Sequence, residues 1–568
     1  MSTETAARMA KKKRTQRKPS KKLPVCTKRD LRTPKRKRRK CTPPKSKAVP
    51  QRPSPAGAVA APPVAAPTPS AFPTPFPTAA PAPNPSPAPS PSPVAGPTPV
   101  RSVEPDAVAT APHVGLAVYS GPFQEAQAQR LLFRAGFGPR PGQAAALAGL
   151  GVREAVSRLL NPGATALEGP APTGGYLVGG QFAPYDKWGH IHLEMLDRMV
   201  RSTDSLTERM TLVLHDWFGV SRAAVEAKLT IEHIALLRAN WRGSFRTLLK
   251  QVTVDPGMLV FLGGSGSSKW APNENYAREL MELYALGADR GAYSETDVRQ
   301  LARAFTGWRH DWSEALRYYN FRLDPNRFDT GTKTVFAGTA AERRGNLNAE
   351  SAVDAVVDHP MHPSFVVRKM WSYFIPTEPA AETQQALEAL YRASGERLDR
   401  LVEAILLHPD LYQGAAMTKP PVVYVAGLMR GVGAGITTDA WIWRCELAGQ
   451  HLGMPPSVAG WNDRAWMNTS SFSARWGMAH ELIKPKTAAA AAYTGKTETA
   501  DQALTAALSA WGNPVVSADH LAMLTRIASR TWIGRTAGDN YGSQASFLAN
   551  RQNVLLQLVG SAPDAHVC

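Results

Sequence analysis

Cysteine is scarce in this sequence, and chemistry that depends on clustered cysteines has no support. Four cysteines occur in 568 residues, namely Cys26, Cys41, Cys445 and Cys568. No two of them have the C-x-x-C spacing of a zinc or redox site, and a disulfide scaffold is excluded. H-E-x-x-H and paired-histidine spacings are also missing, so the sequence predicts neither a metal nor a cofactor.

Long apolar runs are missing as well. No stretch approaches the roughly 18 uninterrupted apolar residues of a membrane span, so we expect no transmembrane segment. The positive charges near the N-terminus are not followed by the apolar run of about 7 to 15 residues that completes a secretory signal. As written, the chain is therefore expected to stay in the cytoplasm.

Motifs of nucleophilic catalysis and of phosphate binding are absent too. The sequence has no G-x-S-x-G elbow and no catalytic Cys/His signature. The glycine-rich stretch MLVFLGGSGSSKW (258–270) lacks both the Gly-Lys step and the following hydroxyl of a P-loop, so a connecting loop is the better interpretation.

Positive charge is in excess, and nearly all of the excess lies at one end. The chain has 66 Lys and Arg against 46 Asp and Glu, and residues 1–50 hold 20 of the bases with only two acids. We expect this arm to contact a polyanion, either nucleic acid or an acidic envelope polymer, without sequence preference. A solubilising tail is the alternative. The side chains expected to make the contact are Lys11, Lys12, Lys13, Arg14, Lys35, Arg36, Lys37, Arg38, Arg39 and Lys40.

Proline is concentrated immediately after the arm, since 23 of the 48 prolines fall between residues 41 and 113. A stretch of Pro, Ala, Ser and Thr buries too little apolar surface to offset the conformational entropy of ordering. The sequence therefore predicts a basic disordered arm (1–50), a Pro/Ala-rich disordered linker (51–118) and a helical domain (119–568).

Apolar residues recur with helical spacing from about residue 119 onward, which predicts a mostly α fold. Only residues 318–338 have the pattern of a short β-hairpin insertion. About 450 residues exceed what one hydrophobic core usually serves, so we expect a multi-helical body with either one elongated core or two lobes. Further helices are expected at 123–136, 142–160, 189–201, 223–240, 243–253, 274–287, 349–357, 363–374, 382–393, 398–407, 420–433, 441–452 and 516–530.

Two helices have N-terminal capping boxes. In SLTERMTLVLHDWFG the box is formed by Ser205 and Glu208, and in the segment from Ser294 to Trp308 it is formed by Ser294 and Asp297. Each pair satisfies two backbone amides that a helix start leaves free, so both segments are predicted with helices beginning at these serines.

The strongest local pattern is PNENYARELMELYALG (272–287). Its polar arc holds Glu274, Asn275, Arg278, Glu279 and Glu282, opposite an apolar arc. One interpretation is a ridge of carboxylates for acid-base chemistry or for holding a cation. The other is a solvated face whose i,i+4 ion pairs contribute a few tenths of a kcal/mol each.

Several motifs together resemble the bacterial domain of unknown function 1800 (DUF1800) family. They are PNENYARELMELYALG, YSETDVRQLARAFTGW behind it, LLFRAGFGPRPG near residue 131, RMTLVLHDWFGVS near 209, FDTGTKTVFAG near 328, HPSFVVRKMWSYF near 362 and GMPPSVAGWNDRAWMNTSSFSARW near 453. The resemblance implies a mostly helical protein, often exported and often encoded beside a sulfatase-like partner. It implies no established reaction.

Carried over position by position, the resemblance implies one shared site. Phe328 stands where many members have a histidine, so a metal or proton-transfer role of that histidine is not carried over. Because PNENYARELMELYALG is the family's most recognisable segment, we expect its ridge to face a pocket and to meet Asp329 and Lys333 there. The catalytic candidates are Glu274, Arg278, Glu279, Asp329 and Lys333, and the binding candidates are Asn273, Asn275, Thr306, Trp308, Arg368, Lys369, Gln450 and Trp461.

Two functions from different classes follow. The first is a tethered binding or scaffold protein, whose helical body docks a partner while the arm contacts a polyanion. The alternative is a helical enzyme of the hydrolase kind that uses a Glu/Arg/Asp/Lys pocket. The near-neutral body, with 46 basic and 44 acidic residues over 51–568, and the missing nucleophile and metal signatures favour the first.

Overall fold

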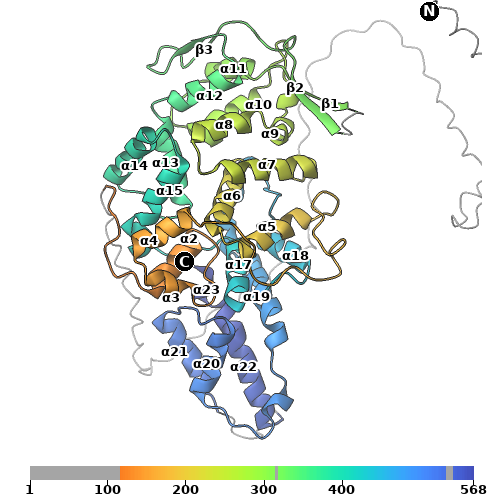
Figure 1. Cartoon of the computed structure of the whole chain (residues 1–568), viewed down its shortest axis with the longest axis vertical. Helices are drawn as coiled ribbons and strands as arrows, with labels where there is room; N and C mark the ends of the chain where they lie inside the picture. The colour runs from red at the N-terminus through yellow and green to blue at the C-terminus, as the bar shows by residue number, and fades with distance from the viewer. Residues whose placement is uncertain (1–114, 314–317, 532–541) are drawn as a thin grey trace, which may run out of the picture. The chain divides into compact units, whose positions relative to one another are not determined.

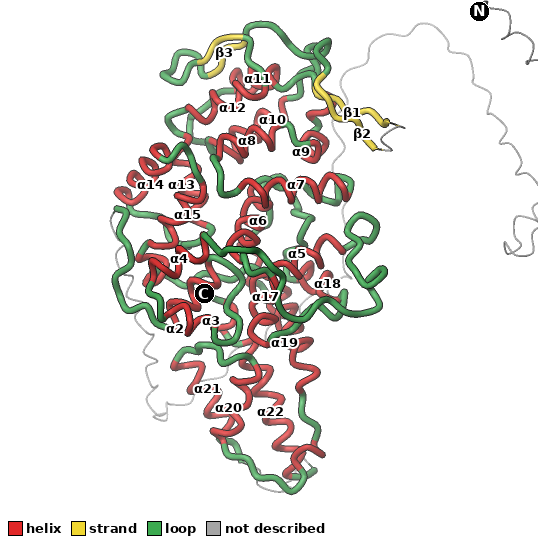
Figure 2. The backbone as a smooth tube through the Cα atoms, viewed as in Figure 1, coloured by secondary structure: helices red, strands yellow, loops and turns green. Residues whose placement is uncertain are grey.

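The computed structural model describes residues 115–313, 318–531 and 542–568. The chain divides into two units, Met1–Arg101 and Ser102–Cys568, and every described residue belongs to the second (Figure 1). The arm predicted at 1–50 and nearly all of the predicted linker lie outside the described residues. The predicted mostly α fold is confirmed, because helices form almost all of the regular structure (Figure 2).

The helices are mostly two to four turns long. The α-helices are α2 (Glu125–Arg134), α3 (Gln143–Ala148), α4 (Val152–Leu160), α5 (His190–Arg201), α6 (Ser205–Trp217), α7 (Ala227–Asn240), α8 (Phe245–Thr253), α9 (Pro256–Phe261), α10 (Glu274–Glu279), α11 (Glu295–Ala304), α12 (Ala349–Asp358), α13 (His362–Ser372), α14 (Ala381–Ala393), α15 (Leu398–Leu407), α16 (Pro409–Gln413), α17 (Pro421–Val432), α18 (Ala440–Leu447), α19 (Thr469–Ile483), α20 (Ala500–Ala510), α21 (Ala518–Ala528), α22 (Gln544–Ser561) and α23 (Pro563–His566). Short 3₁₀ segments are η2 (Gly264–Gly266), η4 (Asp463–Met467), η5 (Lys484–Lys486) and η6 (Ala490–Tyr493), and the π-helical segment η3 (Leu280–Ala285) continues α10.

The described strands form two hairpins instead of the single hairpin expected at 318–338. They are β1 (Trp308–Ser313), antiparallel to β2 (Tyr318–Leu323), and β3 (Lys333–Val335), antiparallel to β4 (Arg343–Gly345). The helix expected to run to Trp308 ends at Ala304, and Gly307 then takes a positive φ of 96°. That turn starts β1, which pairs with β2 so that Trp308 lies opposite Leu323.

One of the two predicted capping boxes is present. The backbone amide of Ser294 donates to Asp297 Oδ2 at 2.8 Å, as expected. The box at Ser205 is wrong, because Asp204 caps α6 and accepts from the amide of Thr207 at 3.0 Å. The Asp204 carboxylate also accepts from the Thr207 hydroxyl at 2.7 Å, and its negative charge suits a helix N-terminus.

Other helices differ from the predicted ones where a glycine interrupts the helix or where buried polar residues hide the apolar periodicity. The helix expected at 142–160 is split into α3 and α4, because Gly151 has a φ of 76°. The helices α19, α20 and α22 were not predicted. In α22 the polar residues Arg551, Gln552 and Gln557 are themselves buried, so the alternation of polar and apolar faces is lost.

Three clusters of buried apolar side chains hold the described chain together. The largest surrounds Trp217 and Trp371, the second lies around α5, α17 and α18, and the third joins α20, α21 and α22 to α19. Helices α20, α21 and α22 lie side by side (Figure 1). Helix α17 packs against both α5 and α19, so it connects the second cluster to the third. None of the described helices is both long and apolar enough to cross a membrane.

Candidate functional site

The polar ridge of α10 lies at the surface. The Arg278 guanidinium donates to Glu295 of α11 at 2.5 and 2.8 Å and to Glu274 at 3.4 Å. The exposed fractions of these side chains are 34% for Arg278, 43% for Glu274 and 65% for Glu295. Glu279 is half-buried, and burial raises the pKa of its carboxyl. Exposed ion pairs of this kind contribute at most about 1 kcal/mol.

Asp329 and Lys333 form a separate cluster with Arg303. Arg303 Nε donates to Asp329 Oδ2 at 2.7 Å and, as the main cause, lowers the pKa of that carboxyl. The buried Lys333 ammonium donates to the Gly331 carbonyl and to Asn346 Oδ1, each at 3.1 Å. In the described ranges, no hydrogen bond or ion pair joins this cluster to the ridge.

The remaining candidates from the motifs near these two groups have local structural contacts. Asn273 caps α10 by accepting from the amide of Asn275 at 2.9 Å. The Thr306 hydroxyl accepts from the amide of Asp329 at 2.8 Å, and Trp308 opens β1. These contacts order the backbone and give no sign of a ligand.

Three other candidates, Lys369, Gln450 and Trp461, converge on one cleft of about 530 Å³. Residues of α6 and α13 form two of its walls, and the segments 417–420 and 461–466 contribute the others. Arg368, the neighbour of Lys369, instead forms a surface ion pair at 3.2 Å. The structure thus separates two adjacent cationic candidates, one in the cleft and one in solvent.

Sequence reasoning missed other residues that line this cleft, among them Arg209, Asp216, Tyr373, Asp463 and Trp466. The sequence separations of these residues could have revealed the site. Arg209 and Asp216 are seven positions apart on α6, and Lys369 of α13 is four positions before Tyr373, the residue that caps the end of α13, so each pair shares a helix face. Charges that recur with helical period on an otherwise apolar segment indicate a buried polar site.

The carboxylate of Asp216 is held by neutral donors. The Tyr373 hydroxyl donates to its Oδ2 at 2.8 Å, and the Trp461 amide donates to its Oδ1 at 2.7 Å. Burial raises the pKa of Asp216, and these two hydrogen bonds oppose the rise. Gly460 permits the close approach, because a Cβ there would collide with Asp216 Oδ1. Burial, with the Asp216 charge next, also raises the pKa of Tyr373 well above its usual value.

Two cations border the same cleft with few partners. Arg209 is 3% exposed, yet its one hydrogen bond within the described residues is a weak one of 3.3 Å to the Tyr373 carbonyl, and its Nε has no partner. Burial lowers its pKa to about 10. The Lys369 ammonium lies 5.2 Å from the centroid of the Trp217 ring. Burial lowers the pKa of Lys369 to about 8, although nearby Asp216 opposes the fall.

Neutral donors complete the cleft walls. The indole nitrogens of Trp461 and Trp466 are buried without a hydrogen-bond partner in the described part of the chain. Gln450 uses its carbonyl oxygen to accept from the Val422 amide at 3.1 Å, which leaves its amide nitrogen as a donor. The site therefore offers several donors, beside the Asp216 and Asp463 carboxylates that also line it. Among the described residues, no three His, Cys, Asp or Glu side chains are placed to hold a metal ion.

The family comparison agrees with the motifs. Residues 130–566 match the family described as "protein of unknown function (DUF1800)", and the chain belongs to this family. Its motifs near 209, 362 and 453 supply α6, α13 and the 461–466 wall of the cleft. No curated protein and no solved structure matches the chain.

Proposed function

We propose that this DUF1800 protein is a tethered binding protein whose helical body takes an anionic group in the cleft of Arg209 and Lys369. One observation carries the proposal. Two cations border one cleft, the buried Arg209 and the half-buried Lys369, and neither has an ion-pair partner in the described ranges. A buried charge is costly unless it is paired, so a bound anion would complete this site.

Charge balance inside the cleft favours a ligand group of one negative charge. Arg209 and Lys369 supply two positive charges, and Asp216 offsets one of them from a distance while it accepts from Tyr373 and Trp461. Asp463 is a second carboxylate that lines the cleft, but its side chain is exposed, so solvent and salt screen its charge. A carboxylate or a sulfate monoester therefore neutralises the site, and both accept hydrogen bonds in the geometry that Arg and Lys offer.

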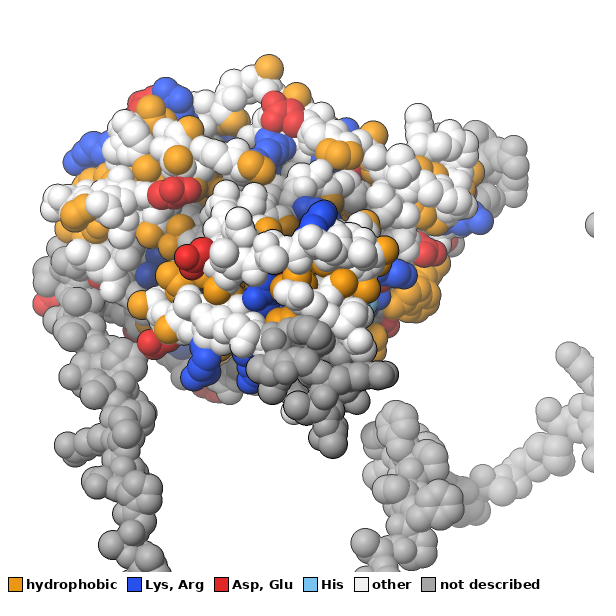
Figure 3. Space-filling view, turned by 90° about the horizontal axis from the view of Figure 1, so that it is seen from below, with side chains coloured by type: hydrophobic (Ala, Val, Ile, Leu, Met, Phe, Trp, Pro, Cys, Tyr) orange, Lys and Arg blue, Asp and Glu red, His pale blue; other side chains and the backbone are white. Residues whose placement is uncertain are grey.

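The N-terminal arm serves as the tether in this proposal. Its 20 basic and two acidic residues attract a polyanion by counterion release. On the face of the body shown in Figure 3, described acidic and basic side chains are scattered among apolar ones, with no cluster of one sign in view. Polyanion contact is accordingly assigned to the arm. By family resemblance, a sulfatase-like protein is the partner whose acidic group we expect the body to dock.

A hydrolase is the second candidate, favoured by one feature of the same cleft. Lys369, whose pKa is lowered to about 8, shares the cleft with the Asp216 carboxylate and the Tyr373 hydroxyl. An amine that titrates near neutral pH is suited to general acid-base catalysis. The catalytic groups would then be these three and not the ridge of α10.

The test is calorimetric titration of the full chain with acetate, methyl sulfate and phosphate. Lys369→Met should weaken binding of the monoanions by about tenfold or more, the usual effect of losing a charge-assisted hydrogen bond. Arg368→Met is the matched control, because it removes the adjacent cation, which lies in solvent outside the cleft. This variant should leave the affinity for the monoanions unchanged. Equal losses in both variants, or no saturable binding by the wild type, would overturn the proposal. Chemical change of a bound ester would favour the hydrolase.

A further inference from the structure

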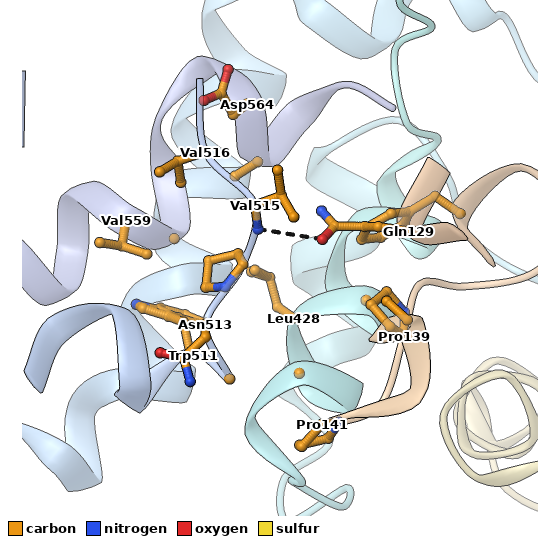
Figure 4. A pocket seen from close by; sticks show the side chains of 18 of the residues that line it. Gln129, Pro139, Pro141, Leu428, Trp511, Asn513, Val515, Val516, Val559 and Asp564 are labelled. Atoms are coloured by element: carbon orange, nitrogen blue, oxygen red, sulfur yellow. Dashed lines mark hydrogen bonds between the residues drawn. The ribbon is translucent and has the colours of Figure 1, made fainter. Parts of the chain in front are cut away.

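A second cavity lies across the segment 417–420 from the cleft. Thr418 borders the cleft, whereas Lys419 borders a narrow slot of about 80 Å³ between α2, α17 and the segment 511–516. Figure 4 shows how this segment passes beside α2, where Gln129 Oε1 accepts from the Val515 amide at 3.3 Å. The slot is thus formed by parts of the chain that are far apart in sequence.

The walls of the slot are mainly apolar and firmly held. They include Phe133, Leu428, Trp511 and Val559, with Leu428 projecting between α2 and the 511–516 segment (Figure 4). Trp511 is fixed by its indole nitrogen, which donates to the Leu556 carbonyl at 2.7 Å. Its ring packs so closely against α22 that a Cβ at Gly560 would collide with it. A wall anchored in this way keeps the slot open instead of collapsing into it.

Two buried polar groups in these walls lack full partners. The Lys419 ammonium is 4% exposed, lies 3.8 Å from the Phe133 ring centroid and donates to the Ala565 carbonyl at 2.9 Å. It has no carboxylate at ion-pair distance among the described side chains; the charges of Cys568 and of Asp564, which also lines the slot, act on it only from a longer distance. His520 is 5% exposed, and its Nδ1 lies 3.2 Å from Asp564 Oδ2, while its Nε2 has no partner.

We propose that the slot binds a short alkyl carboxylate, with its hydrocarbon chain among the apolar walls and its charge paired with Lys419. The apolar walls favour the hydrocarbon part of such a ligand. The Lys419 ammonium, whose hydrogen-bond acceptor is one carbonyl, favours its negatively charged carboxylate. Each water molecule in a cavity takes up ~10–15 Å³. A slot of about 80 Å³ therefore holds roughly five to eight non-hydrogen atoms. Butyrate and hexanoate have this size. The proposal does not depend on the Lys369 cleft.

Calorimetric titration of the full chain with acetate, butyrate, hexanoate, decanoate and hexanol tests this assignment. Each buried methylene strengthens binding about fourfold. Hexanoate has four more methylenes than acetate and should therefore bind about 250-fold more tightly. Decanoate should gain nothing further, because the slot is full. An affinity that climbs steadily to decanoate would overturn the proposal, since it would indicate adsorption to apolar surface.

Variants at the walls locate the binding. Leu428→Trp fills the slot and should weaken hexanoate binding by about tenfold or more, whereas Leu428→Ala enlarges it and should move the preferred chain toward decanoate. Lys419→Met should abolish the preference for hexanoate over hexanol. The Leu428 pair keeps the test decisive if Lys419→Met fails to fold. Unchanged chain-length preference in both Leu428 variants would refute the assignment.

Discussion

Replacing Arg209 with methionine should stabilise the ligand-free protein, although a buried arginine is being removed. Arg209 makes one hydrogen bond of 3.3 Å in the described part of the chain and is almost fully buried. In the absence of an anion, its charge is therefore desolvated with little compensation. Methionine has a similar length and carries no charge, so it can occupy the same space.

The expected gain follows from the pKa of Arg209. Burial lowers that pKa to about 10, and a fall of this size corresponds to roughly 3 kcal/mol. At pH 7 Arg209 carries its proton in both the folded and the unfolded states, so the full loss of folding free energy is present. That loss would be relieved only as the pH rises above about 10. Subtracting about 1 kcal/mol for the lost hydrogen bond leaves a net stabilisation of about 2 kcal/mol.

Urea unfolding of the full chain, followed by far-UV circular dichroism, measures the difference. Arg551→Met is the matched control, because Arg551 is also buried but donates to the Glu498 carboxylate at 2.8 Å and the Ala528 carbonyl at 3.0 Å. Its removal strands these acceptors and should destabilise the fold. A loss of about 3 kcal/mol or more in Arg209→Met would show that Arg209 is structural, and the reasoning would fail.

Three further predictions concern side chains already described. Arg278→Met should change the free energy of unfolding by less than about 1 kcal/mol, because its ion pairs are exposed; a larger loss in urea unfolding would restore the ridge as a buried site. Lys333→Met should cost about 3 kcal/mol or more, since it strands the Gly331 carbonyl and Asn346 Oδ1 inside the protein, and an unchanged midpoint would contradict that burial. Anion affinity at the cleft should be constant below pH 8 and fall about tenfold per pH unit above it, as Lys369 loses its proton; calorimetry between pH 6 and 10 that showed no such fall would exclude Lys369 as the ligand's partner.

The sequence predicted the helical class because the apolar spacing of the surface-facing helices is regular. It missed α22, where buried polar residues remove the contrast between faces, and it placed β2 in the wrong hairpin. The turn at Gly307 decides that pairing, and helical spacing continues past it to Trp308. Local sequence patterns thus identified most helices and strands. They were poor at predicting where a helix ends and which strand pairs with which.

The candidate site was recovered only in part for a similar reason. Lys369, Gln450 and Trp461 came from the family resemblance, and a helical wheel could not show whether the arc around Arg278 faces solvent or protein. Arg209 and Asp216 lie on one face of α6, but their convergence with α13 is a tertiary contact. Which polar face is buried depends on the packing of other segments, so periodicity alone could not choose between the ridge and the cleft.

Anomalous diffraction from crystals of the protein soaked in bromide locates a bound monoanion without assuming its identity. If Arg209 and Lys369 hold an anion, a bromide peak should lie in the cleft, beside the Lys369 ammonium and the Arg209 guanidinium, and it should disappear from crystals of Lys369→Met. Bromide peaks elsewhere on the protein with none in this cleft would contradict anion binding by these two cations.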